Sequence, residues 1–160
     1  MLTYEVLKED DWKELHDVAL TSWLYTYKNI YSADFIRKFI EENYSREAIK
    51  NSLDWAKKNN GFNYVAKDDN KIVGYITFGP FEKTWRLWRI YLLPDYIGKG
   101  IGNDLLGLGE KYIKEKKARD YFIFVHKENK LGKNFYKKKG FIHMPDKDKE
   151  DEFYMKKHLM

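Results

Sequence analysis

The chain of 160 residues contains no cysteine, which excludes disulfides, thiolate-bound metals and a cysteine nucleophile. It also lacks any run of about 18 apolar residues, the length that a membrane-spanning helix needs. Residues 1–8 have no apolar core of signal-peptide length, so we expect a cytoplasmic protein without a membrane partner. Only 3 prolines are present, and no Pro-, Gly- or Ser-rich linker divides the sequence. We therefore expect a single domain over residues 1–160.

Charge of one sign is not concentrated anywhere in the chain. The formal net charge is +5, but 30 basic residues are interleaved with 25 acidic ones along the whole sequence. A nucleic-acid footprint usually needs a basic block or stripe, so we expect no nucleic-acid partner. An anionic small ligand suits the balance equally well. Hydrophobic residues make up 43%, which is ample material for a core.

The N-terminal half begins with a strand pattern, because apolar and polar residues alternate over Leu2–Val6. Helical spacing follows in three segments, the first with Asp10 as its expected N-cap. A segment dense in aromatic residues, 22–31, separates the first helix from the second. The three predicted helices cover approximately 10–19, 32–40 and 45–58.

The middle of the chain predicts strands. Residues 62–67 and 71–78 read as a hairpin, which we expect to end at Gly79 and Pro80. The segment 85–93 carries apolar residues on both faces, as a central strand does. Its Arg86 and Arg89 are expected on opposite faces.

A glycine-rich turn leads from that strand into a helix that begins near residue 101. Its sequence is Tyr91-Leu-Leu-Pro-Asp-Tyr-Ile-Gly-Lys-Gly-Ile-Gly-Asn103. Glycine permits positive φ and a helix start leaves amide N–H groups unpaired, so such a turn can bind phosphate through its backbone. The Gly-Lys-Ser/Thr of a P-loop and the third glycine of a dinucleotide fingerprint are missing. Taken alone, the motif indicates either an anion site or a plain strand-to-helix turn.

The C-terminal part predicts a buried strand over 121–125 and a short helix that Asn129 caps and Gly140 follows. Two last strands are expected over 141–144 and 153–158. Together with the glycine turn, this part resembles the GNAT superfamily of N-acetyltransferases. Residues 62–144 carry the resemblance, and its second motif consists of Asn129, Gly132, Phe135-Tyr136 and Gly140-Phe141.

The resemblance implies an α/β fold with a mixed, mostly antiparallel sheet of six or seven strands flanked by helices. It also implies acetyl-coenzyme A as the cofactor, lying where strands 84–93 and 119–126 splay apart. The backbone of Ile90, Tyr91 and Leu92 would pair with the pantetheine arm as if it were an added strand. Asn129 would bond the pantetheine amides and Gly132 would let the cofactor pass close to its helix. The pyrophosphate would be held by Gly98, Lys99, Gly100, Ile101, Gly102 and Asn103.

Tyr136 is implied as the acid that protonates the departing thiolate. A phenol with a pKa of about 10 stays protonated at neutral pH and can still give its proton to a thiolate whose pKa is about 8.5. Two positions depart from the family pattern, because Ile97 replaces a Gln or Arg and Arg86 replaces a glutamate that can act as base. A backbone carbonyl with ordered water, Glu82 or bulk solvent could then take the proton of the amine.

The aromatic segment resembles that of PaiA-type polyamine acetyltransferases, which implies an amine such as spermidine or spermine. Aromatic faces attract cations, and we expect Trp23, Tyr27 and Tyr31 to bind the acceptor unless they are simply core. A protein N-terminal or lysine acetyltransferase and a non-catalytic acyl-CoA sensor remain alternatives. His16 and His126 have no catalytic or metal-ligating partners at useful spacing, so both are expected to be structural. A homodimer is compatible with the sequence.

Overall fold

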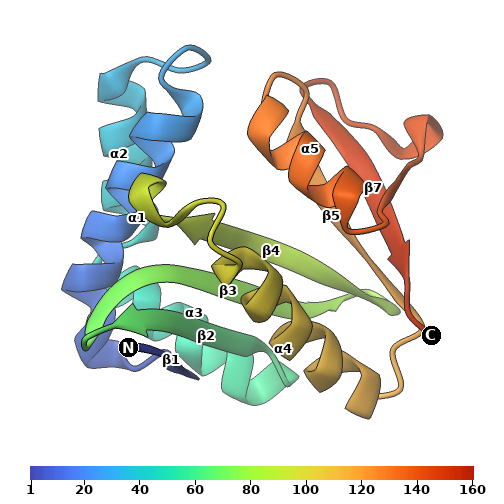
Figure 1. Ribbon diagram of the computed structural model, residues 1–160, viewed down its shortest axis with the longest axis horizontal. Coiled ribbons are helices and arrows are strands. Elements are labelled where there is room, and N and C mark those ends of the chain that lie inside the picture. Colours follow the sequence, from blue (N-terminus) through green and yellow to red (C-terminus); the bar gives the residue numbers. More distant parts are fainter.

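The computed structural model describes residues 1–160, in which three helices follow the first strand and three consecutive strands come next (Figure 1). The strands are β1 (Leu2–Val6), β2 (Phe62–Asp68), β3 (Lys71–Phe81), β4 (Thr84–Leu92), β5 (Asp120–His126), β6 (Ile142–His143) and β7 (Glu152–His158). The α-helices are α1 (Trp12–Tyr27), α2 (Ala33–Asn43), α3 (Arg46–Asn59), α4 (Ile101–Glu115) and α5 (Lys130–Lys138). Short 3-10 turns are η1 (Glu9–Asp11), η2 (Pro94–Tyr96) and η3 (Pro145–Lys147). None of the helices is both long and apolar enough to span a membrane.

All seven strands join one sheet in the order β1-β2-β3-β4-β5-β7-β6. Every neighbouring pair is antiparallel except β4 and β5, whose parallel pairing is confined to Arg86 and Phe122. Beyond that pair the two strands diverge, and β5 and β7 carry α5 away from β4 (Figure 1). The expected α/β fold with a mostly antiparallel sheet is confirmed, and the divergence opens a gap in the middle of the sheet.

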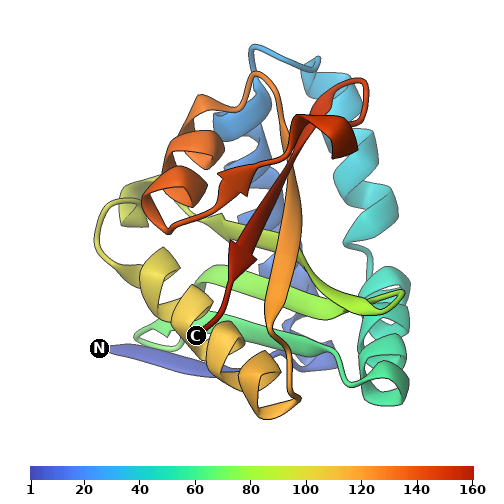
Figure 2. The ribbon, with the colours of Figure 1, turned by 90° about the vertical axis from the view of Figure 1, so that its right-hand side faces the viewer.

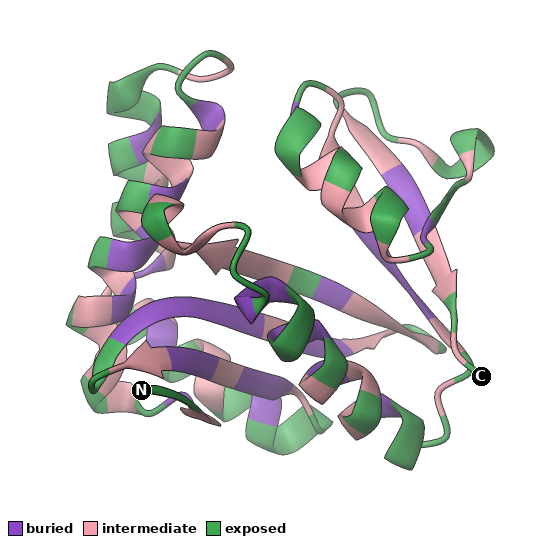
Figure 3. Ribbon diagram, viewed as in Figure 1, coloured by how far each residue is buried: buried purple, intermediate pink, exposed green.

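Helices cover both faces of the sheet, with α4 on one side and α2 and α3 on the other (Figure 2). Two buried clusters result. One packs α4 residues such as Leu105 against Phe78 of β3, and the other packs α1 and α2 against the opposite face around Ile36 and Ile40. The buried residues concentrate along β2, β3 and the inner side of α4 (Figure 3). These cores hold β3 and β4 rigidly beside the gap.

Two helices begin where serine side chains cap them. The side chain of Ser32 accepts a hydrogen bond from the amide of Phe35, and Ser45 accepts one from Ala48. Asn60, with a φ of 59°, ends α3 in the left-handed conformation. The first helix differs from the prediction, since Asp10 lies in η1 and α1 continues through the aromatic segment to Tyr27.

The β3 strand passes through Gly79 and Pro80 instead of ending there, so that prediction is wrong. Beyond Phe78, β3 has no β2 neighbour and pairs only with β4. A proline is tolerated at such an edge because no ladder hydrogen bond needs its missing N–H.

A bulge interrupts β4 at Trp88. Thr77 of β3 pairs with Arg89 and Phe78 pairs with Leu87, which leaves Trp88 without a partner. One extra residue reverses the alternation of side chains along the strand. Arg86 and Arg89 therefore line the same pocket, contrary to the expectation that they lie on opposite faces.

Candidate active site

A groove runs along the gap between β4 and β5, with α5 as its second wall. Its lining contains residues from three separate stretches of the chain that were assigned from the sequence to the cofactor or to the chemistry. They are Ile90, Tyr91, Leu92, Gly102, Asn129, Gly132 and Tyr136. Ile97 also lines the groove, so the position that departs from the family pattern contributes an apolar wall. Most of the lining is hydrophobic, which suits the pantetheine chain better than it suits a charged ligand.

The open edge of β4 offers backbone groups to this groove. Leu93 donates its amide to Val73 of β3, and hydrogen-bonding direction alternates along an antiparallel strand. Tyr91 therefore shares the ladder with β3, whereas the backbone of Ile90 and Leu92 faces the gap. The carbonyl of Leu92 accepts a hydrogen bond from the buried hydroxyl of Ser22 at 2.9 Å, which ties α1 to this edge.

The glycine turn adopts the conformation that only glycine takes readily. Gly98 and Gly100 have φ values of 84° and 87°. A side chain at either position would contact no neighbouring atom, but it would strain the backbone, because residues other than glycine rarely adopt positive φ. The amides of Ile101, Gly102 and Asn103 stand in the first turn of α4 and have no intrahelical acceptor. The side chain of Ile101 is buried in the core, so only its backbone is available. The turn thus presents amide donors at a helix start, the arrangement that binds phosphate.

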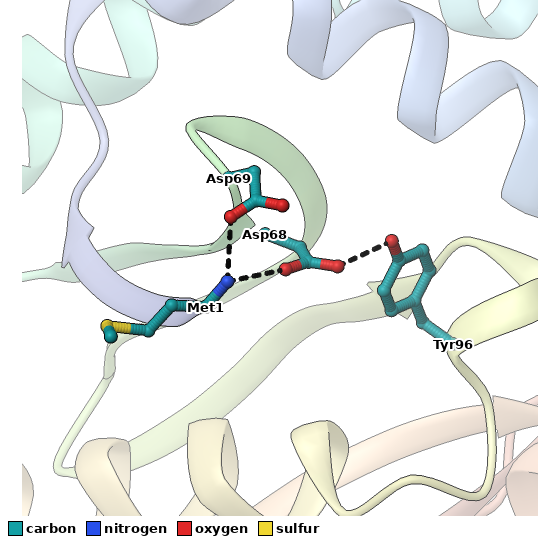
Figure 4. Close-up of polar contacts among 4 residues, drawn as sticks. All are labelled: Met1, Asp68, Asp69 and Tyr96. Carbon is teal, nitrogen blue, oxygen red and sulfur yellow. Dashed lines mark hydrogen bonds and ion pairs between the residues drawn. The ribbon is translucent and has the colours of Figure 1, made fainter.

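Polar contacts hold the turn from the N-terminal edge of the sheet. Tyr96 of η2 donates its hydroxyl to Asp68 at 2.8 Å, and the ammonium of Met1 bonds Asp68 and Asp69 (Figure 4). The hydrogen bond from Tyr96 lowers the pKa of Asp68. The ammonium of Lys99 lies over the ring of Tyr96, 5.1 Å from its centroid, so this charge stays beside the backbone of the turn.

Asn129 and Gly132 are coupled to each other at the start of α5. The side-chain oxygen of Asn129 accepts the amide of Gly132 at 2.9 Å and caps the helix. A Cβ atom at position 132 would lie 2.7 Å from the side-chain nitrogen of Asn129. The glycine therefore leaves room for this cap, and the side chain of Asn129 also lies close enough to Tyr27 to hydrogen-bond it.

Tyr136 enters the groove from α5 and packs against Phe135 and Phe141. Burial raises the pKa of its hydroxyl, and the nearby Tyr27 adds to the shift. No protein group hydrogen-bonds this hydroxyl. It is consequently a protonated donor that points at space a ligand can fill.

A second pocket adjoins the groove on the side of α1 and α2. It brings together the three aromatic residues that the sequence placed on the acceptor, namely Trp23, Tyr27 and Tyr31. Tyr27 and Tyr91 line both cavities, and their hydroxyls lie 3.0 Å apart. We call this cavity the acceptor pocket.

The acceptor pocket also contains residues that the sequence did not single out for this site. Glu152 of β7 and His126 of β5 lie opposite each other in the sheet and both line the pocket. No local motif marks Glu152, because it reaches the pocket only through the pairing of β7 with β5. Glu82, considered as a base, is exposed in the turn between β3 and β4 and lines neither cavity.

A splayed sheet with a donor-rich helix start, an apolar groove and a half-buried tyrosine fits an acyltransferase that uses a coenzyme A thioester. Residues 13–141 match the acetyltransferase (GNAT) family, and the chain belongs to that family. The protein is therefore an N-acetyltransferase that depends on acetyl-CoA.

Similar proteins cover almost the whole chain. A spermidine N(1)-acetyltransferase of Thermoplasma acidophilum is 35% identical over 95% of this chain and 94% of its own length. A crystal structure of PaiA N-acetyltransferase from the same organism, in complex with coenzyme A, superposes with a TM-score of 0.93 at 31% identity, covering 99% of each chain. A GNAT acetyltransferase of Staphylococcus aureus has a TM-score of 0.79 at 17% identity and covers 100% of both chains, which supports the fold alone.

Proposed function

We propose that the acceptor of the acetyl group is a polyamine such as spermidine or spermine. The observation that carries this proposal is the carboxylate of Glu152 beside three aromatic residues, Trp23, Tyr27 and Tyr31, in the lining of the acceptor pocket. Burial raises the pKa of Tyr31, and the charges of Glu152, Asp151 and Glu128 raise it further. A carboxylate in an aromatic pocket, with two further negative charges near Tyr31, suits a chain of ammonium groups. The similarity to a spermidine N(1)-acetyltransferase supports the same acceptor class.

The transfer would proceed directly between two bound substrates. The pantetheine arm of acetyl-CoA would lie along the open edge of β4, with its pyrophosphate on the amides of Gly98 to Asn103. Asn129 would donate to a pantetheine carbonyl. The amine nitrogen would attack the thioester carbon from the acceptor pocket, and no covalent enzyme intermediate is needed.

Two protons must move in this reaction. Tyr136 would give its proton to the sulfur as the carbon–sulfur bond breaks. An amine with a pKa of about 10 is almost entirely protonated at pH 7 and must lose a proton before it attacks. Because Glu82 lies outside both cavities, ordered water in the acceptor pocket is the route we favour. We place the reaction in the cytoplasm, without a nucleic-acid partner.

The test is thiol release from acetyl-CoA with spermidine, spermine and a monoamine of similar length. Polyamines should be preferred, and Glu152→Gln should raise the KM for spermidine about tenfold, the effect of losing one charge-assisted contact. Glu150→Gln is the matched control, since Glu150 is exposed and lines neither cavity. Equal turnover of monoamine and polyamine, or equal effects of the two variants, would remove the polyamine as acceptor.

A further inference from the structure

One part of the acceptor pocket, which we call its floor, is basic, although the lining also contains Glu152. Arg86 and Arg89 both line it, and neither guanidinium forms an ion pair with any carboxylate. Their contacts are with aromatic faces instead. The guanidinium of Arg86 lies 4.0 Å from the ring centroid of Trp88, and that of Arg89 lies 4.6 Å from the ring centroid of Tyr44.

The same floor holds two buried hydrogen-bond donors without acceptors. They are the Nε atom of Arg86 and the Nε1 atom of Trp23. Buried donors are nearly always paired in folded proteins, and a half-buried guanidinium without a counter-ion is costly. Burial lowers the pKa of Arg86, and the charge of Glu152 in the same pocket offsets part of that shift without forming an ion pair. Both donors belong to residues that line one cavity, so a single acceptor-bearing ligand could satisfy them.

A bare polyamine cannot supply that partner, because it carries only donors and positive charge. The lining of the pocket thus contains the carboxylate of Glu152 as well as the two guanidiniums. A molecule with an ammonium group at one end and a carboxylate at the other matches both. Arginine forks also fit carboxylates in a way that ammonium groups do not.

We propose that the acceptor pocket also takes α,ω-diamino acids, whose carboxylate is bound by Arg86 and Arg89. This further activity rests on the proposed acetyl transfer in the same pocket and uses the same chemistry. The amine nitrogen forms its bond to the acetyl carbon, and the carbon–sulfur bond breaks. The sulfur takes the proton of Tyr136, and the proton that the amine loses returns through water to the phenolate. The products are an N-acetylamino acid and coenzyme A.

The experiment compares acceptors that differ only by a carboxylate: lysine against cadaverine, and ornithine against putrescine, with spermidine alongside. Wild type should acetylate both amino acids. Arg86→Met should lower kcat/KM for lysine about ten- to hundredfold while that for cadaverine changes about threefold at most. Arg86→Lys keeps the charge and should retain part of the lysine activity. Arg37→Met, an exposed position on α2, should change neither substrate.

Each outcome separates this inference from the proposed polyamine function. Turnover of spermidine without lysine or ornithine overturns the carboxylate site and leaves the polyamine function intact. Equal losses for lysine and cadaverine in Arg86→Met overturn it as well. Turnover of lysine without spermidine supports the carboxylate site and removes the polyamine proposal, whereas no turnover of any amine removes both. Should Arg86→Met fold poorly, Arg89→Met tests the same contact.

Discussion

The hydroxyl of Tyr136 is the group in the groove that we expect to move a proton. Tyr136→Phe should lower kcat about a hundredfold or more, the usual contribution of a general acid, with little change in the KM for acetyl-CoA. Tyr25→Phe, at an exposed tyrosine, should leave kcat unchanged. Steady-state thiol release measures both constants. A Phe variant with full kcat would assign the proton transfer to solvent.

The pH dependence follows from the same residue. Burial raises the pKa of Tyr136, so its acid form persists beyond the ordinary tyrosine value of about 10. As pH rises, kcat should not fall through loss of this proton until above about pH 10. A decline near pH 8 that disappears in Tyr136→Phe would contradict this reading.

We expect Tyr96 to affect cofactor binding through the turn that it anchors. Tyr96→Phe removes the hydrogen bond to Asp68 and should raise the KM for acetyl-CoA about three- to tenfold while kcat stays nearly constant. Tyr112→Phe is the matched control, because its hydroxyl donates to the carbonyl of Asn60 at 2.9 Å, far along α4 from the turn. Similar increases in the KM for acetyl-CoA in both variants would mean that losing either hydrogen bond destabilises the protein as a whole and has no specific effect on the turn.

At the scale of elements, two of the three glycines in α4 have opposite surroundings. A Cβ atom at Gly109 would lie 2.1 Å from the ring of Phe78, whereas one at Gly107 would meet nothing within 4 Å. Gly109→Ala should therefore destabilise the protein by about 1–3 kcal/mol through overpacking. Gly107→Ala should stabilise it by about 0.5–1 kcal/mol, because alanine favours an exposed helix. Urea unfolding compares the two, and equal effects would refute the close packing of α4 on β3.

The β4 strand shows how one element serves two cavities. Its open edge faces the groove beyond the single parallel pair with β5, while its bulge at Trp88 turns Arg86 and Arg89 into the acceptor pocket. Because the bulge adds one residue to β4, the side chains beyond it face the opposite side from the one that regular alternation would give. Residues of one short segment therefore line both cavities, and in the proposed reaction this segment would bring the two substrates together.

For the whole molecule, we expect a bound cofactor to add most stability at the gap between β4 and β5. The two parts of the sheet meet at one paired position, and acetyl-CoA would contact both walls of the groove. At a concentration 100 times its Kd, coenzyme A should stabilise the fold by about 2.7 kcal/mol. Thermal unfolding with and without coenzyme A measures this, and hydrogen exchange should slow most in α5 and the first turn of α4. Tyr136→Phe should keep the full shift, since the phenol is assigned to chemistry and not to binding. An unchanged melting temperature would contradict binding in this groove.

Local chemistry made much of this protein predictable from sequence. Ser32 and Ser45 mark helix starts because their side chains cap unpaired amides, and Gly98 and Gly100 mark a turn because only glycine adopts its φ readily. The glycine turn and the motif from Asn129 to Phe141 that follows it carried the resemblance to the family and implied its cofactor. Such features depend on neighbours within a few residues, so the sequence contains them in full.

Only the tertiary structure decided what the acceptor pocket contains. Arg86 shares a side with Arg89 because of a bulge that exists only in the register between β3 and β4. Glu152 reaches the pocket because β7 pairs with β5, a contact between segments far apart in the chain. Long-range pairing sets both positions, and its energy is spread over many residues with no local signature. The sequence by itself therefore determined which cofactor the protein uses, while the fold determined which charged residues line the acceptor pocket.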